Sequence, residues 1–381
     1  MNILHIHQDY PDGRARPPTK AVQNLIKASK EYDKSVDHYV LSINRTSNPF
    51  KVSVKAFDEG LSIVYWAIPL PYIYVPMIWF CSIYMAFFLR KQKFTLIHGH
   101  KLTTEGIFTY FFSKKFNIPY VLSVRGGSDI HNIKRLKLIV FFKKIYNHAS
   151  LIFWVSVWAK KHVRLLLNVK IEENNALPNI CEINLNNKVS STSRNKYVII
   201  LSYHQLRRKG LLPLLEAIKE LNNQGNILYL DVIGSGDKIT TQLIKNSIQS
   251  LELGEQVKLL GQLPLNEVLE HLKKSKGLIL PAINETFGMA YVEALSCGSP
   301  VLYVSDTGID GHIDDYLLGV KVEGHNVESL KLALLKLEGN YSQYQKALSQ
   351  IIENKYLVKF TGPFIAQKYV EQVLTVKYIE N

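Results

Sequence analysis

The chain has 381 residues, of which 47% are hydrophobic and 20% charged. That length is too great for one ordinary hydrophobic core and predicts two domains of roughly 150–200 residues. The composition excludes a disordered chain. The 46 Lys and Arg against 32 Asp and Glu give a net charge of +14, which implies an anionic partner. Nucleic acid, anionic lipid and nucleotide-sugar phosphate all fit that sign.

Cysteine content and the first residues indicate the compartment. Cys81, Cys181 and Cys297 lie far apart and in no metal-binding spacing. We therefore expect reduced thiols, with neither a zinc site nor a disulfide. The opening run MNILHIH enters a strand directly, without the basic and apolar regions of a secretory signal. These features predict a cytoplasmic protein.

Short apolar runs alternate with helical stretches in the first half of the chain. Strands are predicted at 3–6, 39–41, 95–98, 120–124 and 151–155, and helices at 19–29, 77–91, 104–116 and 133–148. Such alternation predicts parallel strands with helices on both faces of the sheet. The segments 9–20 and 44–59 are expected to be loops.

The stretch 63–89 contains no charged residue and is longer than the ~18 apolar residues that indicate a spanning helix. Prolines at 69, 71 and 76 interrupt it. The remaining helix, 77–90, would be roughly 20 Å long and cannot cross about 30 Å of hydrocarbon. We expect a buried helix beside the sheet. The alternative is a surface element at a membrane interface, where its aromatic residues are enriched, namely Trp66, Tyr72, Tyr74, Trp79 and Tyr84.

A second alternating series follows a segment rich in Asn, Ser and Thr. Its strands are predicted at 198–201, 229–233, 257–261, 277–280 and 301–304, with a helix at 210–223. The predicted organisation is an N-terminal domain (1–175), a linker (176–196), a C-terminal domain (197–357) and a final segment (358–381). Two doubly wound sheets would face a cleft, with ligands at the carboxyl ends of the strands.

The loop after 277–280 opens the run NETFGMAYVEAL at 284–295. Glu285 falls on the loop and Glu293 inside the helix that follows. Backbone N–H groups at a helix start, around Phe287, Gly288 and Met289, favour a phosphate. A glutamate two turns further along can accept a hydrogen bond from a sugar hydroxyl. The alternative is a solvated helix face with a helix-start carboxylate.

Cations follow the strand at 198–201. Arg208 and Lys209 precede Gly210 at a helix start, where positive charge opposes the helix dipole, so a bound anion would explain them. A guanidinium can bind a diphosphate bidentately. The alternative is a solvated charge cluster. Gly234 and Gly236, after the strand at 229–233, are interpreted as support for the scaffold.

Two loops of the first half also follow strands. The run LSVRGGSD at 122–129 brings Arg125 and Asp129 close to two glycines that allow close approach of a ligand, and the alternative for Asp129 is a helix cap. In the loop 8–20, Gly13 lies between Arg14 and Arg16, which either bind an acceptor phosphate or lie in solvent.

Other polar groups allow two interpretations each. His98 and His100 follow the third predicted strand and are either groups facing the cleft or buried structural histidines. Cations at 134–144 interleave with apolar residues, which is typical of a helix on an anionic membrane surface and also of a core helix with solvated lysines.

In their order and spacing, these C-terminal loops resemble the donor-binding signature of the retaining glycosyltransferases of family 4, which have the GT-B fold. The resemblance is specific over 198–308. It implies that 1–175 is the acceptor-side domain, that 197–357 is the nucleotide-sugar donor domain, and that 358–381 forms a helix that crosses back to the N-terminal domain. It implies that Arg208 and Lys209 stabilise the leaving diphosphate and that Glu285 lies near the transferred sugar. It further implies backbone donors at 287–289, a ribose ligand at Glu293, and glycines near the base at Gly234 and Gly236.

The acceptor side departs from the family pattern. The usual His-Gly-x-Asp is replaced by a motif with Arg125 and Asp129 and no histidine, and only Gly13 remains of a Gly-Gly pair. Tyr203 and His204 stand where the family usually has Gly-Arg, so the role of His204 stays open.

The implied function is a hexosyltransferase that moves a sugar from a nucleotide-diphosphate donor to a hydroxyl of a lipid-linked or polysaccharide-precursor acceptor, with retention. We expect no cofactor and no metal, because no Asp-x-Asp pair stands in a donor loop, and no nucleic-acid partner. The expected location is the cytoplasm, with peripheral contact at the inner face of the plasma membrane. The alternatives are a nucleotide-sugar epimerase of the same fold and a non-catalytic basic binding or partner protein.

Overall fold

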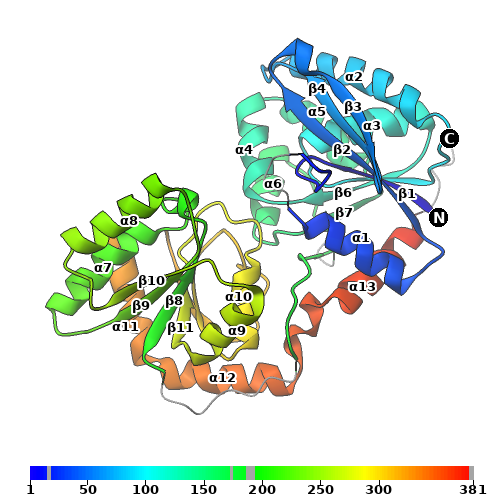
Figure 1. Ribbon diagram of the computed structural model, residues 1–381. Helices are drawn as coiled ribbons and strands as arrows, with labels where there is room; N and C mark the ends of the chain where they lie inside the picture. Colours follow the sequence, from blue (N-terminus) through cyan, green and yellow to red (C-terminus); the bar gives the residue numbers. More distant parts are fainter. Residues whose placement is uncertain (15–18, 172–174, 186–193, 377–381) are drawn as a thin grey trace. The chain divides into compact units, whose positions relative to one another are not determined.

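The computed structural model describes residues 1–14, 19–171, 175–185 and 194–376. Arg16, part of the predicted linker and the end of the segment 358–381 lie outside these residues. The chain divides into two compact units (Figure 1). Unit 1 comprises Met1–Ile180 and Gly362–Asn381, and unit 2 comprises Cys181–Thr361.

Within the described residues of unit 1, seven strands form one sheet in the order β3-β4-β2-β1-β5-β6-β7. All neighbours are parallel except β3 and β4. The strands are β1 (Asn2–His7), β2 (Asp37–Thr46), β3 (Ser53–Phe57), β4 (Gly60–Trp66), β5 (Leu96–Gly99), β6 (Tyr120–Val124) and β7 (Leu151–Trp154).

The predicted loop at 44–59 is wrong. It contains the end of β2, a short 3₁₀ turn η1 (Pro49–Lys51) and the edge strand β3, which pairs antiparallel with β4. An edge strand is covered on one side only, so β3 keeps exposed residues such as Lys55 and lacks the apolar run of a central strand. The hairpin widens an otherwise parallel sheet.

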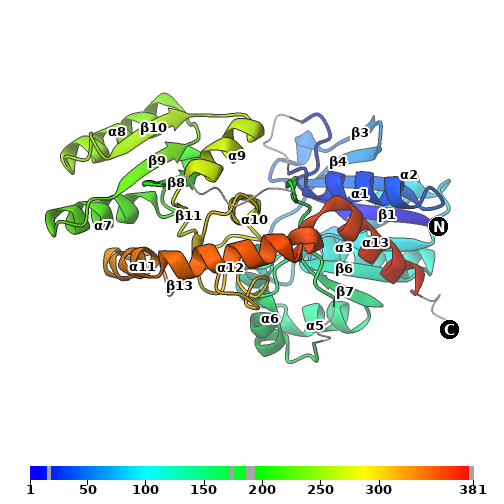
Figure 2. The same ribbon diagram turned by 90° about the horizontal axis from the view of Figure 1, so that it is seen from below.

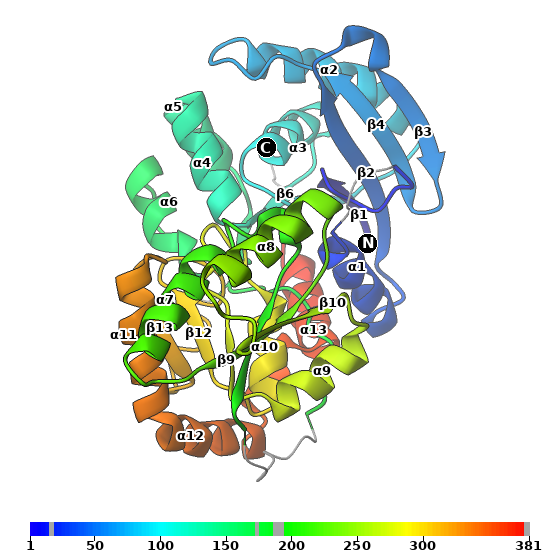
Figure 3. The same ribbon diagram turned by 60° about the vertical axis from the view of Figure 1, so that its left-hand side comes forward.

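Helices cover both faces of the unit 1 sheet. Helices α1 and α13 lie side by side on one face (Figure 2), where they share a core with Ile3, Val121 and Phe153. The other face packs against the remaining helices, and Figure 3 shows α4, α5 and α6 grouped together. The helices are α1 (Ala21–Tyr32), α2 (Tyr74–Leu89), α3 (Thr104–Phe116), α4 (Gly127–Leu136), α5 (Ile139–Asn147), α6 (Ala159–Leu167) and α13 (Gly362–Leu374).

The single helix predicted at 133–148 is wrong, because the chain forms α4 and α5 instead. Lys137 adopts φ 53° and caps the C-terminus of α4, with its N–H donating to the Ile133 carbonyl. A left-handed residue at this position ends a helix, and the next one begins at Ile139.

The prediction of a buried helix within 63–89 is correct for only one face of α2. Ile78, Met85 and Leu89 are buried against the unit 1 core. The opposite face, including Phe80 and Phe87, lies in solvent. Among the described residues, no helix is both long and apolar enough to span a membrane.

Unit 2 has, in its described part, a six-stranded parallel sheet in the order β10-β9-β8-β11-β12-β13. The strands are β8 (Lys196–Ile200), β9 (Tyr229–Ile233), β10 (Val257–Gly261), β11 (Gly277–Ile279), β12 (Val301–Val304) and β13 (Gly319–Val322). The helices are α7 (Leu211–Asn223), α8 (Lys238–Ser250), α9 (Leu265–Lys274), α10 (Met289–Ser296), α11 (Val327–Gly339) and α12 (Tyr341–Glu353), with 3₁₀ turns η2 (Tyr203–Gln205) and η3 (Tyr356–Phe360).

The strand order of unit 2 reverses between β8 and β11. In an open parallel sheet this switch point leaves a crevice at the carboxyl ends of the two strands, where ligands bind. The loops that leave β8 and β11 carry Lys209 and Glu285. In unit 1 the order reverses between β1 and β5.

Candidate active site

Three predicted residues meet at the switch point of unit 2. Lys209 Nζ donates to Glu285 Oε2 over 2.5 Å, and Arg208 Nη1 reaches the same oxygen at 3.4 Å. Arg208 also donates to the Asn284 carbonyl (3.2 Å) and the Gln205 side chain (2.7 Å). The Lys209 and Glu285 side chains are largely buried. One carboxylate thus balances two cations, and these cations can also bind an anionic ligand.

The loop after β12 holds the backbone of Glu285 in place. The Glu285 N–H donates to Thr307 Oγ1 (2.6 Å), and the Glu285 carbonyl accepts from the Thr307 hydroxyl (3.1 Å) and the Gly308 N–H (2.9 Å). No role is predicted for Thr307 from the sequence. The Thr307 hydroxyl bonds both backbone groups of Glu285, and this contact could not be predicted from the sequence because the two residues lie on different loops.

Helix α10 begins directly after this loop, as predicted. Gly288 is its N-cap residue, with φ +75°, and an added Cβ would lie 2.5 Å from the Tyr291 ring. The position therefore needs glycine both for its backbone and for space. Phe287 is fully buried against His312 and Phe360, so only its backbone is available to a ligand. Met289 is exposed.

Glu293 lies inside α10 and is largely shielded from water. Burial raises the pKa of its carboxyl to about 7, and the charge of Glu182 contributes in the same direction. A carboxyl with a pKa near neutrality changes its hydrogen-bonding character within the physiological pH range.

The loop after β9 packs against η2. The Tyr203 N–H donates to the Ser235 carbonyl (2.8 Å), and the Gly234 N–H donates to the Gly261 carbonyl (2.8 Å). A Cβ at Gly236 would lie 2.6 Å from the Tyr203 Cβ. Both glycines therefore allow close packing beside the loop that carries Lys209. His204 is exposed, with its Nδ1 3.9 Å from an oxygen of Asp237.

In unit 1, Asp129 is fully buried and both of its oxygens are occupied. Oδ1 accepts from the Leu102 and Thr103 N–H groups (3.0 and 3.2 Å), and Oδ2 accepts from the Arg125 N–H (2.8 Å). Burial raises the pKa of Asp129 to about 6. The side chain thus joins the loop after β6 to the loop after β5.

Arg125 is also buried, and burial lowers its pKa to about 10. Its Nε donates to the His100 carbonyl (3.1 Å) and its Nη1 to Asn179 Oδ1 (3.3 Å). The guanidinium therefore holds backbone at the switch point of unit 1.

A second polar cluster at that switch point was missed by sequence reasoning. Lys101 Nζ lies 3.4 Å from both Glu105 Oε1 and Asp9 Oδ2, and His7 Nδ1 lies 3.6 Å from Glu105. Burial opposes ionisation of Glu105, but Lys101 and His7 lower its pKa to about 2. The i,i+4 spacing of Lys101 and Glu105 was the available sequence signal.

Gly13 adopts φ +80° in the first loop, and a Cβ added there would meet no atom of the described residues within 4 Å. Its neighbours form an ion pair: Arg14 Nε donates to Asp12 Oδ1 (2.8 Å), and Arg14 also donates to Ser42 Oγ (2.6 Å). The prediction that the arginines bind an acceptor phosphate is untested, and Arg14 already contacts a carboxylate.

His98 and His100 belong to a buried network on the α13 face of the unit 1 sheet. His98 hydrogen-bonds the Tyr369 hydroxyl (3.0 Å) and Ser123 Oγ (2.8 Å). His5 connects His100 (2.9 Å) with His38 (2.8 Å). The structure therefore supports the interpretation of both predicted residues as buried structural histidines.

This network is the arrangement in the described residues most similar to a metal site. Single ring nitrogens of His5, His98 and His100 lie within 4.8 Å of one another. Burial lowers the pKa of all three well below the ordinary value, so the rings are neutral. Both nitrogens of His5 and of His98 already take part in hydrogen bonds, which a metal ion would have to replace.

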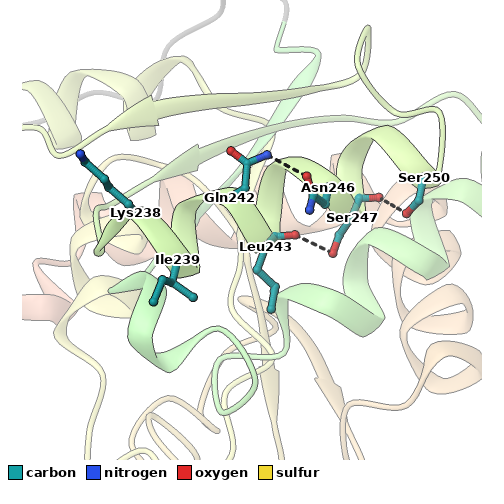
Figure 4. Close-up of a pocket in the computed structure, with 7 residues that line it drawn as sticks. All are labelled: Lys238, Ile239, Gln242, Leu243, Asn246, Ser247 and Ser250. Atoms are coloured by element: carbon teal, nitrogen blue, oxygen red, sulfur yellow. Dashed lines mark hydrogen bonds between the residues drawn. The ribbon is translucent and has the colours of Figure 1, made fainter.

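A shallow groove runs along the exposed side of α8 (Figure 4). All its lining residues come from this one helix, and Gln242 and Asn246 hydrogen-bond each other there (2.8 Å). Lys238 is the one charged side chain among them. Its described lining lacks the polar groups from several loops that typically converge at an active site.

Comparison with known proteins agrees with this architecture. A family model for glycosyl transferases group 1 matches residues 184–374, half of the chain. An uncharacterized glycosyltransferase of Methanocaldococcus jannaschii is 26% identical over 265 residues, which are 69% of this chain and 70% of that protein. The UDP-Gal:alpha-D-GlcNAc-diphosphoundecaprenol alpha-1,3-galactosyltransferase of Escherichia coli is 22% identical over 275 residues, or 65% and 67% of the two chains. HepE of Anabaena, solved in complex with UDP, superposes with a TM-score of 0.69 at 15% identity, over 98% of this chain and 100% of that one.

Two parallel-sheet α/β units of this kind define the GT-B fold, and the predicted fold class is confirmed. The match to the family model identifies the enzyme class as well. The chain belongs to the glycosyl transferases group 1 family and is a glycosyltransferase.

Proposed function

We propose that this glycosyltransferase moves a hexose from a nucleoside-diphosphate donor to a hydroxyl of a lipid-linked or polysaccharide-precursor acceptor, with retention of the anomeric configuration. The observation that carries the proposal is the contact of Lys209 and Arg208 with Glu285 at the switch point of unit 2. Donor chemistry of this kind is supported by HepE, whose structure contains UDP. The name of the Escherichia coli relative describes a UDP-sugar donor and a diphosphoundecaprenol-linked acceptor.

In this proposal, Arg208 and Lys209 bind the diphosphate. Negative charge grows on the leaving nucleoside diphosphate as its bond to the sugar breaks, and fixed cations stabilise that charge. Lys209 Nζ lies 2.5 Å from Glu285 Oε2, so the carboxylate balances the charge of the ammonium. When the donor binds, its phosphates also contact the Lys209 ammonium, and the Glu285 carboxylate can accept a hydrogen bond from a hydroxyl of the transferred sugar.

Helix α10 supplies the remaining donor contacts. The backbone N–H groups at 287–289 lie directly before and at the start of α10, where the positive end of the helix dipole favours a phosphate. Glu293 would accept hydrogen bonds from the ribose hydroxyls. We propose that the diphosphate charge is balanced by these groups without a metal ion, so that transfer persists in EDTA.

Acceptor roles are proposed for unit 1. Arg125 and Asp129 shape the loop after β6 through their backbone contacts, and Gly13 keeps the first loop open. The exposed Asp9, beside Lys101, is the carboxylate of this region best placed to meet a hydroxyl.

The test begins with thermal shifts against a panel of UDP-, GDP- and dTDP-sugars, followed by transfer assays with the donor that binds. Lys209→Ala should lower kcat/KM roughly 10–100-fold, the value of one hydrogen bond to a charged group. Glu285→Gln should lower kcat while the affinity for the nucleoside diphosphate is unchanged or increased. Lys276→Ala is the matched control. It also removes a lysine from an ion pair of unit 2, in this case the pair with Glu338 next to the start of β11.

Each outcome has a distinct meaning. If Lys209→Ala and Glu285→Gln both stay within a few-fold of the wild type, the assigned site is wrong. Epimerisation of the donor sugar in the absence of an acceptor would indicate an epimerase. Failure of every nucleotide sugar to shift the melting temperature would favour a non-catalytic protein.

A further inference from the structure

Helix α2 exposes a continuous apolar face to solvent. We define the α2 face by the exposed side chains Trp79, Phe80, Ile83, Tyr84, Phe87 and Phe88. Phe80 is 64% and Phe87 56% exposed, although the helix is well packed on its other side. Apolar side chains gathered on one exposed face, rather than scattered singly, mark an interaction surface.

The segment before α2 extends this surface. Leu70 and Tyr72 are also exposed, and Tyr72 adopts φ 67°, a left-handed conformation that costs energy for a bulky residue. The core of unit 1 therefore buries only some of the apolar residues of 68–88, and the others lie in solvent.

The charged residues that flank α2 in the sequence are of one sign. No Asp or Glu occurs anywhere from 60 to 104. Exposed Arg90, Lys91 and Lys93 follow the helix directly, and the Arg90 guanidinium lies over the Phe87 ring at 4.0 Å. Aromatic side chains beside cations are characteristic of elements that lie at the headgroup level of a bilayer.

Unit 1 carries the entire net charge of the protein. It contains 27 Lys and Arg against 13 Asp and Glu, whereas unit 2 contains 19 against 19. The asymmetry opposes pairing of two copies through unit 1 and favours an anionic surface. It also argues against the donor as the sole reason for the +14 charge, since the proposed donor site lies in neutral unit 2.

We infer that the α2 face inserts its aromatic side chains into an anionic lipid bilayer, with α2 lying in the plane of the interface. A helix of 16 residues is too short to cross the hydrocarbon and suits this orientation. The exposed cations after α2 bind lipid phosphates. The membrane is also the proposed source of a lipid-linked acceptor, so the role of this surface in catalysis rests on the proposed function, whereas its test does not.

The experiment is cosedimentation of the full-length protein with vesicles of phosphatidylcholine alone or mixed with phosphatidylglycerol. We expect binding to the mixed vesicles that weakens at high salt, because exposed charges are screened. Phe80→Ser with Phe87→Ser should reduce partitioning about 10-fold or more. The matched control is Ile239→Ser with Leu332→Ser in unit 2, whose side chains are 78% and 61% exposed; it should bind like the wild type.

Two results would overturn the inference. The first is equal partitioning of the wild type and the Phe80/Phe87 variant, or no partitioning of the wild type to anionic vesicles. The second is a wild-type dimer that the same variant converts to a monomer, which would assign the α2 face to a second copy. Thermal shifts with the donor on all variants separate this question from the proposed function: vesicle binding without donor binding refutes only the latter.

Discussion

Acid should unfold unit 1 at a pH that leaves most carboxylates ionised. The cause is a group of five buried histidines whose pKa values are lowered, chiefly by loss of water around the ring: His5, His7, His38, His98 and His100. For His7 and His38 the pKa falls to about 4. In the unfolded chain each ring returns to the ordinary value of about 6.5.

The sign follows from proton counts. Below pH 6.5 the unfolded chain binds protons that the folded chain excludes, so the stability of unit 1 is complete above pH 6.5 and is lost as the pH falls. Asp129 acts in the opposite direction, because burial raises its pKa to about 6 and the folded state then holds one more proton. His7 and His38 each exclude most of one proton between pH 6 and pH 5, which together is about 2–3 kcal/mol per pH unit, and His5, His98 and His100 act in the same direction.

For a domain with about 5–15 kcal/mol of stability, this is a large loss over a few pH units. Tryptophan fluorescence is a selective probe, because Trp66, Trp79, Trp154 and Trp158 all lie in unit 1. Urea titrations at pH 7.5, 6.5 and 5.5 should show midpoints that fall steeply. Far-UV circular dichroism should show that unit 2 outlasts unit 1, since the pKa of about 7 at Glu293 gives unit 2 the reverse dependence.

The variant His38→Gln provides the internal control. It removes one proton-binding ring and keeps a side chain that can bond His5, so the slope should fall by about 1.4 kcal/mol per pH unit. A urea midpoint that is the same at pH 7.5 and 5.5 would refute the reasoning. A slope unchanged in His38→Gln would exclude that ring as a contributor.

Three further predictions concern the proposed donor site. Donor affinity should decline as the pH falls through 7, because a protonated Glu293 no longer accepts two ribose hydroxyls, and calorimetric titration of Glu293→Gln should show weaker binding without that dependence. Gly288→Ala should lower the free energy of unfolding by about 1–3 kcal/mol, because the new Cβ is strained at this φ and contacts the Tyr291 ring. Gly13→Ala has a similar φ but no such contact in the described residues, and should lower it by about 1 kcal/mol. Equal losses in the two variants would contradict the role of Tyr291. Dialysis against EDTA should leave the transfer rate unchanged, and a rate restored only by added metal would refute the metal-free proposal.

Much of the unit 2 site could be predicted because its signals are local. A buried strand, a loop with Glu285 and a helix start at Gly288 follow one another within a few residues, and Arg208 and Lys209 follow their own strand in the same way. Since ligand loops of a parallel sheet gather at the carboxyl ends of its strands, proximity could be inferred without coordinates. The hydroxyl of Thr307 has no such signal, because its role depends on two loops that are separate in sequence.

Unit 1 was harder to predict for two physical reasons. The edge strand β3 is amphipathic and only partly buried, so its sequence resembles a loop, and Lys137 ends α4 without a glycine to mark the position. The absence of charge in α2 predicts burial in the core, but contact with a lipid bilayer favours the same composition. The histidine network joins residues as far apart as His5 and His100, a pairing that no local pattern contains.

The contact between His98 and Tyr369 joins residues 271 positions apart and has a consequence for biosynthesis. Helix α13 supplies part of the unit 1 core, so the first 180 residues lack one of their covering helices until residues 362–374 have left the ribosome. Unit 2 is continuous in sequence and is available in full earlier. Domains usually complete their folds in order from the N-terminus. In this protein the middle of the chain can finish first, and the face of β1 and β5 that awaits α13 is the surface a chaperone would have to protect.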